Sequence, residues 1–166
     1  MTGDWLDGYA GQTTAELLAL EGRFRTDSIV VAVREAIEQK AARIGDASLT
    51  AAERTVLDCG TFEDAVNGDG FVGLFTDRAE VVSTLVDSLL AIGRPEVADL
   101  VRRAIDALDV RGPLTAEAVE AAVDADDEAV TERLHELDQA YYALAIDLAD
   151  PLLAFIRAHP DQVVLP

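Results

Sequence analysis

The chain has 166 residues, enough for one domain and short for two, and half of them are apolar, so a core of normal size can form. Its 32 acidic residues against 13 basic ones give a formal charge of −19, which excludes direct binding of nucleic acid because phosphate contacts need clustered lysine and arginine. The chain lacks a run of 18 apolar residues and a secretory signal, and its one cysteine is Cys59. We therefore expect a cytoplasmic protein that neither crosses a membrane nor forms an internal disulfide.

Apolar side chains recur with the 3.6-residue period of a helix, and no segment alternates apolar and polar residues as a strand would. This pattern predicts an all-α fold, a compact single-domain helical bundle of about seven or eight helices. We expect residues 1–12 to be a poorly ordered N-terminal segment and residues 13–166 to form the single domain. Breaks between helices are predicted near Gly45, Asn67–Gly70, Gly93, Gly112–Pro113 and Asp150–Pro151.

Side chains that can cap a helix mark the predicted helix starts. Thr13 or Thr14 precedes a short helix, and Asp27 precedes the next one. Thr50 and Glu53 have the spacing of a capping box, in which each side chain accepts a hydrogen bond from the other residue's backbone N–H. The later starts are expected at Thr76 or Asp77, at Pro95, after Thr115, before a long apolar pattern from Val130 to Leu148, and at Asp150 followed by Pro151.

Residues that carry enzyme chemistry are few and scattered. No nucleophile stands beside His135 or His159, and Cys59 falls on the apolar side of its helix, which is typical of a buried side chain. The Glu-x-x-His motif that begins at Glu132 occurs once, whereas a di-iron bundle needs it on two helices. We therefore expect a protein that is not an enzyme and that has no catalytic residue, no cofactor and no metal site.

The acidic residues are concentrated in one part of the sequence. Residues 112–156 contain eleven acidic residues and one basic residue, Arg133. Six of these acids follow spacings of 3-4-4-4-4, which places them on one stripe if the helix is continuous and on two shorter stripes if it breaks at Asp126. Like charges one turn apart cost a helix about 0.2–0.5 kcal/mol per pair, so stability does not explain them. We call the following residues the acidic surface and expect them to bind a partner: Glu117, Glu120, Asp124, Asp127, Glu128, Glu132 and Glu136.

Charge alone leaves two interpretations of the acidic surface open. It can present negative charge, as DNA does, to a basic partner. It can equally be the solvated face of a protein from a salt-adapted source, because a single lysine, Lys40, against twelve arginines suggests a GC-rich or salt-adapted organism.

Several segments resemble one known family. The similar segments, within about residues 49–163, are Leu49–Arg54, Val66–Phe71, Phe75, Leu90–Gly93, Leu137–Tyr142 and Leu152–Ile156. The family pattern has a glutamate, then V-N-N-G-G-F-x-Q-F-F, and then a helix that ends in I-G, and it is that of the DNA-mimic-protein domain family. The matching positions, which we expect to be structural, are Glu63, Val66, Asn67, Gly70, Phe71, Phe75 and Gly93, while Gly68, Asp69, Gly73 and Leu74 depart from the pattern.

The resemblance implies an all-α homodimer whose acidic surface imitates duplex DNA and occupies a transcription factor. The protein would then be a non-enzymatic inhibitor that binds a basic, DNA-binding partner such as a transcription factor, a nucleoid protein or a nuclease. One alternative is an immunity protein that neutralises a toxin, because some members of the family look like such proteins, and a neighbouring toxin gene would favour it. The other alternative is an enzyme with a carboxylate or metal site, which would need a deep polar pocket.

Overall fold

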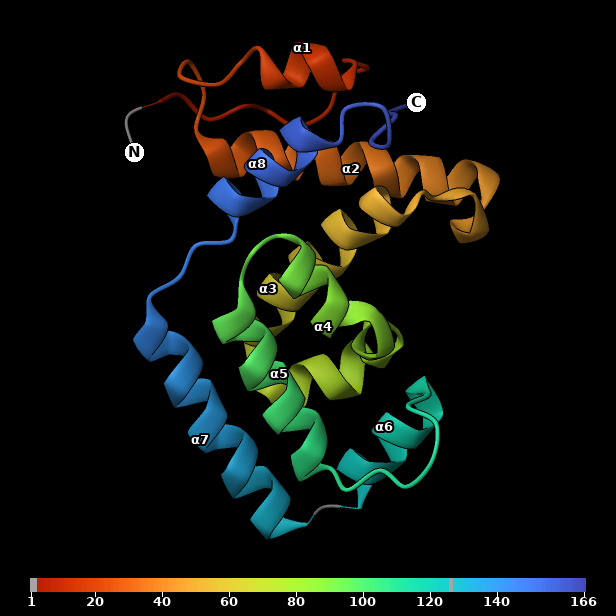
Figure 1. Cartoon of the computed structure of the whole chain (residues 1–166), viewed down its shortest axis with the longest axis vertical. Coiled ribbons are helices and arrows are strands. Elements are labelled where there is room, and N and C mark those ends of the chain that lie inside the picture. Colours follow the sequence, from red (N-terminus) through yellow and green to blue (C-terminus); the bar gives the residue numbers. More distant parts are fainter. Residues whose placement is uncertain (1–2, 126) are drawn as a thin grey trace. The chain divides into compact units, whose positions relative to one another are not determined.

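The structure is a computed structural model that describes residues 3–125 and 127–166 (Figure 1). The prediction of an all-α fold is confirmed, since these residues form helices and contain no β-strand. None of the helices in the described ranges is long and apolar enough to cross a membrane. The helices are α1 (Thr14–Leu18), α2 (Thr26–Ile44), α3 (Ala51–Asp77), α4 (Val82–Ala91), α5 (Pro95–Ala107), α6 (Ala116–Asp124), α7 (Glu128–Leu144) and α8 (Ala149–Ala158), with 3-10 turns η1 (Asp46–Ser48) and η2 (Ala79–Val81).

The chain divides into two compact units, which we call the terminal unit and the central unit. The terminal unit consists of Met1–Leu57 and Asp147–Pro166, and the central unit of Asp58–Ile146. Helix α3 contributes to both units, and the chain returns to the terminal unit with α8. The periodicity of the sequence contains no sign of this return, and the single domain over residues 13–166 stays a prediction.

Helix α2 is the centre of the terminal unit, where α1 and α8 pack on it (Figure 1). One apolar side of α2 lies in the core, since Val33 and Ile37 are fully buried and Val30 nearly so. The burial ends before the last turn of the helix, where Ile44 is 60% exposed. The last turn of α2 therefore extends beyond the core that the earlier turns help to form.

The described part of the N-terminal segment, residues 3–12, is attached to the terminal unit by specific hydrogen bonds. The Arg25 N–H donates to the Asp4 carbonyl at 2.9 Å, and the Tyr9 N–H donates to the Glu35 carboxylate at 2.8 Å. The Tyr9 hydroxyl donates to the Pro166 carbonyl at 2.6 Å. The sequence gives no signal for these bonds, because they join residues far apart in the chain, and the poor order of residues 1–12 stays a prediction.

Three predicted caps are confirmed. Thr13 and Glu16 form a capping box at α1, and the Thr115 hydroxyl accepts from the Ala118 N–H at the start of α6. In the predicted capping box of α3, the Glu53 N–H donates to the Thr50 hydroxyl at 3.1 Å and the Thr50 N–H donates to the Glu53 carboxylate at 2.9 Å. These interactions are local, which is why the sequence predicts them.

The predicted boundaries of α2, α7 and α8 are each wrong at one end. Asp27 does not cap α2, because the helix begins at Thr26 and the Asp27 carboxylate pairs with the guanidinium of Arg25. Helix α8 begins at Ala149 rather than at Asp150 and Pro151, because the Asp147 carboxylate accepts from the Ala149 N–H at 2.7 Å. Helix α7 ends at Leu144, before the predicted Leu148, since Ala145 adopts a left-handed conformation with φ +48°.

The central unit packs α4 against α5 and α5 against α7, while α6 lies against η2. Its core contains Phe62, whose ring meets Tyr141 edge-on with 5.4 Å between centroids. Cys59 is fully buried as predicted, and burial raises the pKa of its thiol, so the reactive thiolate is disfavoured. The breaks near Gly45, Gly93 and Gly112–Pro113 are confirmed.

The break predicted near Asn67–Gly70 is confirmed inside α3, where Asp69 and Gly70 leave helical geometry. The predicted restart at Thr76 or Asp77 is wrong, since the helix resumes at Phe71 and α4 begins only at Val82. The sequence is misleading here because the second half of α3 has no local capping side chain of its own.

Candidate partner-binding surface

The negative charge lies mainly in the central unit. Residues 58–146 contain 20 acidic and 6 basic residues, a net charge of −14, whereas the terminal unit contains 12 and 7, a net charge of −5. The two units are similar in length, so the difference reflects where the acids are placed. The central unit is therefore the part of the molecule that attracts cations most strongly.

The acidic surface is distributed over two helices. Helix α6 carries Glu117, Glu120 and Asp124, and α7 begins at Glu128, so of the two predicted arrangements the single continuous stripe is wrong and the two shorter stripes are correct. The proposed break point, Asp126, lies outside the described residues. All seven predicted members of the acidic surface are exposed to solvent.

Two of the seven predicted carboxylates already have partners. Asp127 caps α7, since its Oδ1 accepts from the Ala129 N–H at 2.9 Å. Glu136 accepts from the Arg133 guanidinium at 2.7 Å. The other five form no hydrogen bond or ion pair with a described residue, which leaves their charge available: Glu117, Glu120, Asp124, Glu128 and Glu132.

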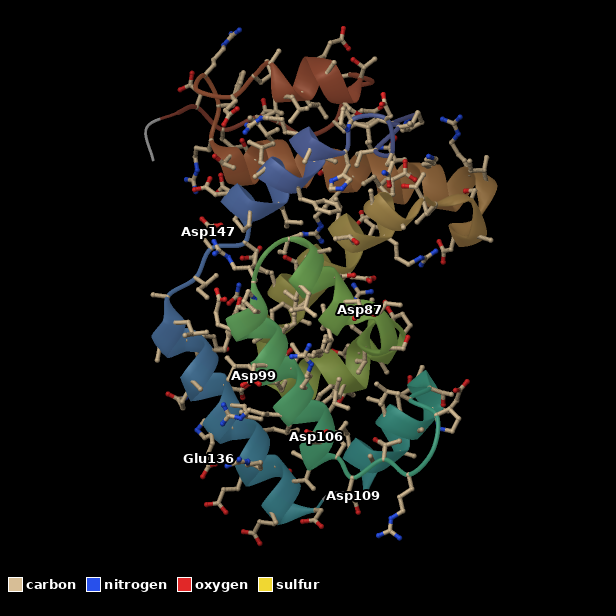
Figure 2. All side chains as sticks on the ribbon, in the orientation of Figure 1. Asp87, Asp99, Asp106, Asp109, Glu136 and Asp147 are labelled. Carbon is tan, nitrogen blue, oxygen red and sulfur yellow. The ribbon has the colours of Figure 1, made fainter. Side chains whose placement is uncertain are left out.

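Further acids that the sequence analysis did not select lie beside α7. Asp99 and Asp106 are exposed on α5, and Figure 2 shows them on the same side of the central unit as Glu136. The contact between α5 and α7 brings them there, although Arg103 lies 4.0 Å from Asp99 and weakens its field. Their spacing of seven residues, two helical turns, is the signal in the sequence that could have placed them on one face.

A shallow hollow on α7 lies within the acidic surface. It has a volume of about 700 Å³ and is lined by Glu128, Thr131, Glu132 and His135. This lining suits a cationic side chain, since two carboxylates one helical turn apart can both face it. In the described ranges, no three His, Cys, Asp or Glu side chains form a group that could hold a metal ion.

The break in α3 is held by α7. The Phe71 N–H, which would bond to a carbonyl four residues earlier in a continuous helix, donates to Asp138 Oδ1 at 2.8 Å. One turn further along α7, the Tyr142 hydroxyl donates to the Val66 carbonyl at 2.7 Å. Two side chains of α7 therefore satisfy backbone groups on both sides of the break, and we call these two bonds the α3–α7 clamp.

Gly70 makes the clamp possible. Its φ of +67° and ψ of −162° belong to a region that glycine alone adopts readily, and a Cβ built there would lie 2.5 Å from Asp138 Oδ2. Phe71 and Phe75 then lie fully buried in the core. Of the other family positions, Val66 is buried, Glu63 is half-buried, and Asn67 and Gly93 are exposed.

Replacing Asp138 by asparagine should change how stability depends on pH. Burial raises the pKa of Asp138, although the bond from Phe71 opposes this, so the folded protein holds a proton there more strongly than the unfolded chain does. The ionised carboxylate therefore costs stability above that pKa. D138N should gain stability over the wild type at pH 7, and this gain should shrink as pH falls toward 3.8.

Urea unfolding at a series of pH values measures this effect, with D87N as the matched control because Asp87 is an exposed carboxylate on α4 (Figure 2). Both variants remove one negative charge, so their difference isolates burial of the carboxylate. Identical pH profiles for the two variants would contradict the prediction.

The comparison with protein families agrees with these features. A family model described as DMP19-like protein matches residues 47–159, which is more than half of the chain and includes α3, α6, α7 and α8. The match confirms the resemblance to the DNA-mimic-protein domain family noted from the sequence. Comparison with curated proteins and with solved structures gave no match. The chain therefore belongs to the family of DMP19-like proteins.

Proposed function

We propose that this protein is a non-enzymatic acidic binding protein whose central unit occupies the DNA-binding surface of a basic partner. The observation that carries the proposal is the set of five exposed carboxylates on α6 and α7 that have no partner among the described residues. Its membership of a family named for DNA mimicry supports the same role. Carboxylates would take the place of phosphates opposite lysine and arginine, and long-range attraction would speed the encounter.

The uneven charge also bears on the alternative of a salt-adapted surface. Adaptation to salt acts on the whole solvated surface, so it would distribute acidic residues over both units. Here the central unit has a net charge of −14 and the terminal unit −5. This concentration favours a surface directed at a partner, of the basic DNA-binding class to which transcription factors, nucleoid proteins and nucleases belong.

Removing four charges from the acidic surface should weaken partner binding without unfolding the protein. The variant E117Q/E120Q/E128Q/E132Q keeps side-chain size and helix propensity and removes repulsion between like charges, so its thermal midpoint should stay level or rise. The association rate with the partner should fall about tenfold or more, with a flatter dependence on salt.

The matched control removes four exposed charges from the terminal unit, in the variant D7N/D46N/D150N/D161N. Both variants have a net charge of −15, so only the position of the lost charge differs. Equal loss of binding in both variants would mean that overall charge, and not the acidic surface, governs the interaction.

The mode of action is tested by competition with DNA. The immobilised protein captures a partner from a nuclease-treated extract of its own cells, and the purified partner is loaded with fluorescently labelled duplex DNA. Adding the wild-type protein should release the DNA, which lowers the fluorescence anisotropy, and the four-charge variant should need a higher concentration. DNA that stays bound in the presence of excess wild-type protein would refute the mimicry.

A further inference from the structure

Resting on the proposed function, we infer that Asp138 and Tyr142 are positioning residues for the acidic surface. They fasten α7 to the break in α3 and thereby fix the direction in which α7 presents Glu128 and Glu132 to a partner. Neither residue belongs to the acidic surface, and their role is carried by the backbone groups that they bind.

The two halves of α7 have different roles. The carboxylates Glu128 and Glu132 are exposed in its first half, whereas the clamp residues Asp138 and Tyr142 lie in its second half. Because a helix is stiff over this length, fixing the second half also fixes the direction of the first. Between them, buried Leu134 anchors the same helix to the core of the central unit.

The clamp lies where the helical geometry of α3 is interrupted, at Asp69 and Gly70. A helix that stops and restarts leaves carbonyls without partners before the break and N–H groups without partners after it. Asp138 accepts from the Phe71 N–H at 2.8 Å and Tyr142 donates to the Val66 carbonyl at 2.7 Å, so each side of the break has one bond to α7. Without these two bonds, the backbone at Gly70 could rotate, and α7 would no longer be held in one position relative to α3.

The fit at Gly70 shows how closely α7 approaches. The Asp138 carboxylate occupies the space that a Cβ on Gly70 would fill, at 2.5 Å from the ideal Cβ position. A longer or looser contact would remove this clash, although the backbone strain of a side chain at this φ would remain. The close approach therefore defines one arrangement of α3 and α7 in the central unit, and a surface that imitates a rigid polyanion needs such a fixed arrangement, since affinity for a rigid partner depends on preorganised charges.

Asp138 gives a clean pair of variants. D138A and D138N both remove one negative charge, but the asparagine Oδ1 can still accept from the Phe71 N–H, so only D138A opens the clamp. Y142F removes the hydroxyl that binds the Val66 carbonyl and keeps the ring. Affinity is measured for two probes, the purified partner from the capture experiment and a flexible ten-residue lysine peptide.

Opening the clamp should weaken partner binding and leave peptide binding unchanged. D138A should lose about threefold to thirtyfold in affinity for the folded partner relative to D138N, and Y142F should change in the same direction. The lysine peptide adapts to moved charges, so it should bind D138A and D138N equally. If Asp138 served only to stabilise the fold, D138A would change the affinity for the folded partner and for the lysine peptide to the same extent.

The position of α7 is measured directly with spin labels on A129C in α7 and S83C in α4, both exposed sites in the central unit. The native Cys59 is buried and is not labelled in the folded protein. D138A should broaden or shift the distance distribution between the two labels, and D138N should reproduce that of the wild type. An unchanged distribution in D138A would overturn the positioning role.

The four-charge variant, measured in the same assay, separates this inference from the proposed function. If that variant loses affinity while D138A binds the partner as D138N does, the clamp has no positioning role and the acidic surface keeps its function. If the four-charge variant and D138A both bind like the wild type, the proposed function fails, and the clamp inference fails with it. Should D138A not fold, Y142F decides by the same comparisons.

Discussion

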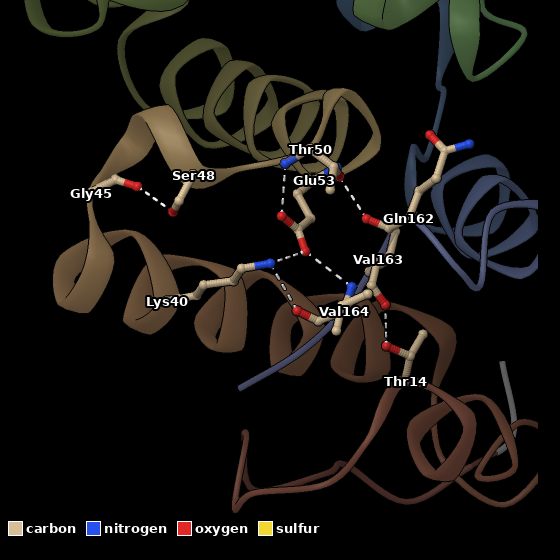
Figure 3. A network of polar contacts seen from close by, with 9 residues as sticks. All are labelled: Thr14, Lys40, Gly45, Ser48, Thr50, Glu53, Gln162, Val163 and Val164. Carbon is tan, nitrogen blue, oxygen red and sulfur yellow. Dashed lines mark hydrogen bonds and ion pairs between the residues drawn. The ribbon is translucent and has the colours of Figure 1, made fainter.

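Replacing Glu53 by alanine should destabilise the protein by about 3–5 kcal/mol, the range for removing one partner of a buried ion pair. The Glu53 side chain is fully buried in the terminal unit, where it accepts from the Lys40 ammonium at 2.7 Å (Figure 3). It also accepts from the Val164 N–H at 3.0 Å and from the Thr50 N–H at 2.9 Å. The alanine variant therefore leaves the half-buried Lys40 ammonium without its counter-ion, with only the Val164 carbonyl as a partner, and leaves two N–H groups without this acceptor.

Urea unfolding of E53A and of E16A measures the effect of burial. Glu16 belongs to the capping box of α1, where its carboxylate accepts from the Thr13 N–H at 2.8 Å but is exposed. E16A should cost much less than E53A, because water can replace its bonds. The double variant K40M/E53A should recover part of the loss, since it leaves no unpaired ammonium, and equal costs for E53A and E16A would contradict the account.

Replacing Gly70 by alanine should cost about 2–4 kcal/mol, from backbone strain together with loss of the Asp138 cap. The new Cβ would meet the Asp138 carboxylate at 2.5 Å, and the φ of +67° with ψ of −162° disfavours any side chain. In the D138A background the steric part of this cost should disappear and the strain should remain. The two single variants and the double variant, unfolded in urea, separate these contributions.

Gly68 is the matched control for Gly70, because a Cβ there would meet no atom within 4 Å and its φ lies outside the left-handed region. G68A should be neutral or stabilise the protein by up to about 1 kcal/mol, as expected for glycine to alanine in a helix. A comparable loss of stability in G68A and G70A would mean that glycine composition, and not the contact with Asp138, governs this segment.

The sequence predicts contacts between residues that are close in the chain and misses contacts between residues that are far apart in it. The capping box of Thr50 and Glu53 is visible because the two residues are three apart. The bond from Val164 to Glu53 is not visible, because 111 residues separate them. In the same way, the glycines indicate a break in α3, whereas nothing in the spacing indicates that Asp138, 67 residues beyond Phe71, would cap its second half.

The sequence could predict which acidic residues form the acidic surface. It could predict only in part which of their carboxylates already have a partner within the chain. The i,i+3 spacing of Arg133 and Glu136 is a local signal that could have removed Glu136 from the set of available carboxylates. The placement of Asp99 and Asp106 beside α7 depends on the packing of α5 on α7, which the periodicity of either helix leaves undetermined. Helix pairing is decided by the shape of the whole core, and each stripe fits more than one neighbour.

Because the terminal unit is assembled from two separate stretches of chain, its parts leave the ribosome at different times. Glu53 emerges long before Val164, and until then its carboxylate lacks a neighbour that the folded protein provides. The central unit is one continuous stretch, so it can complete its core while the C-terminal residues are still being translated. On the proposed function, a nascent chain can therefore display the carboxylates of the central unit to a partner before α8 has been translated.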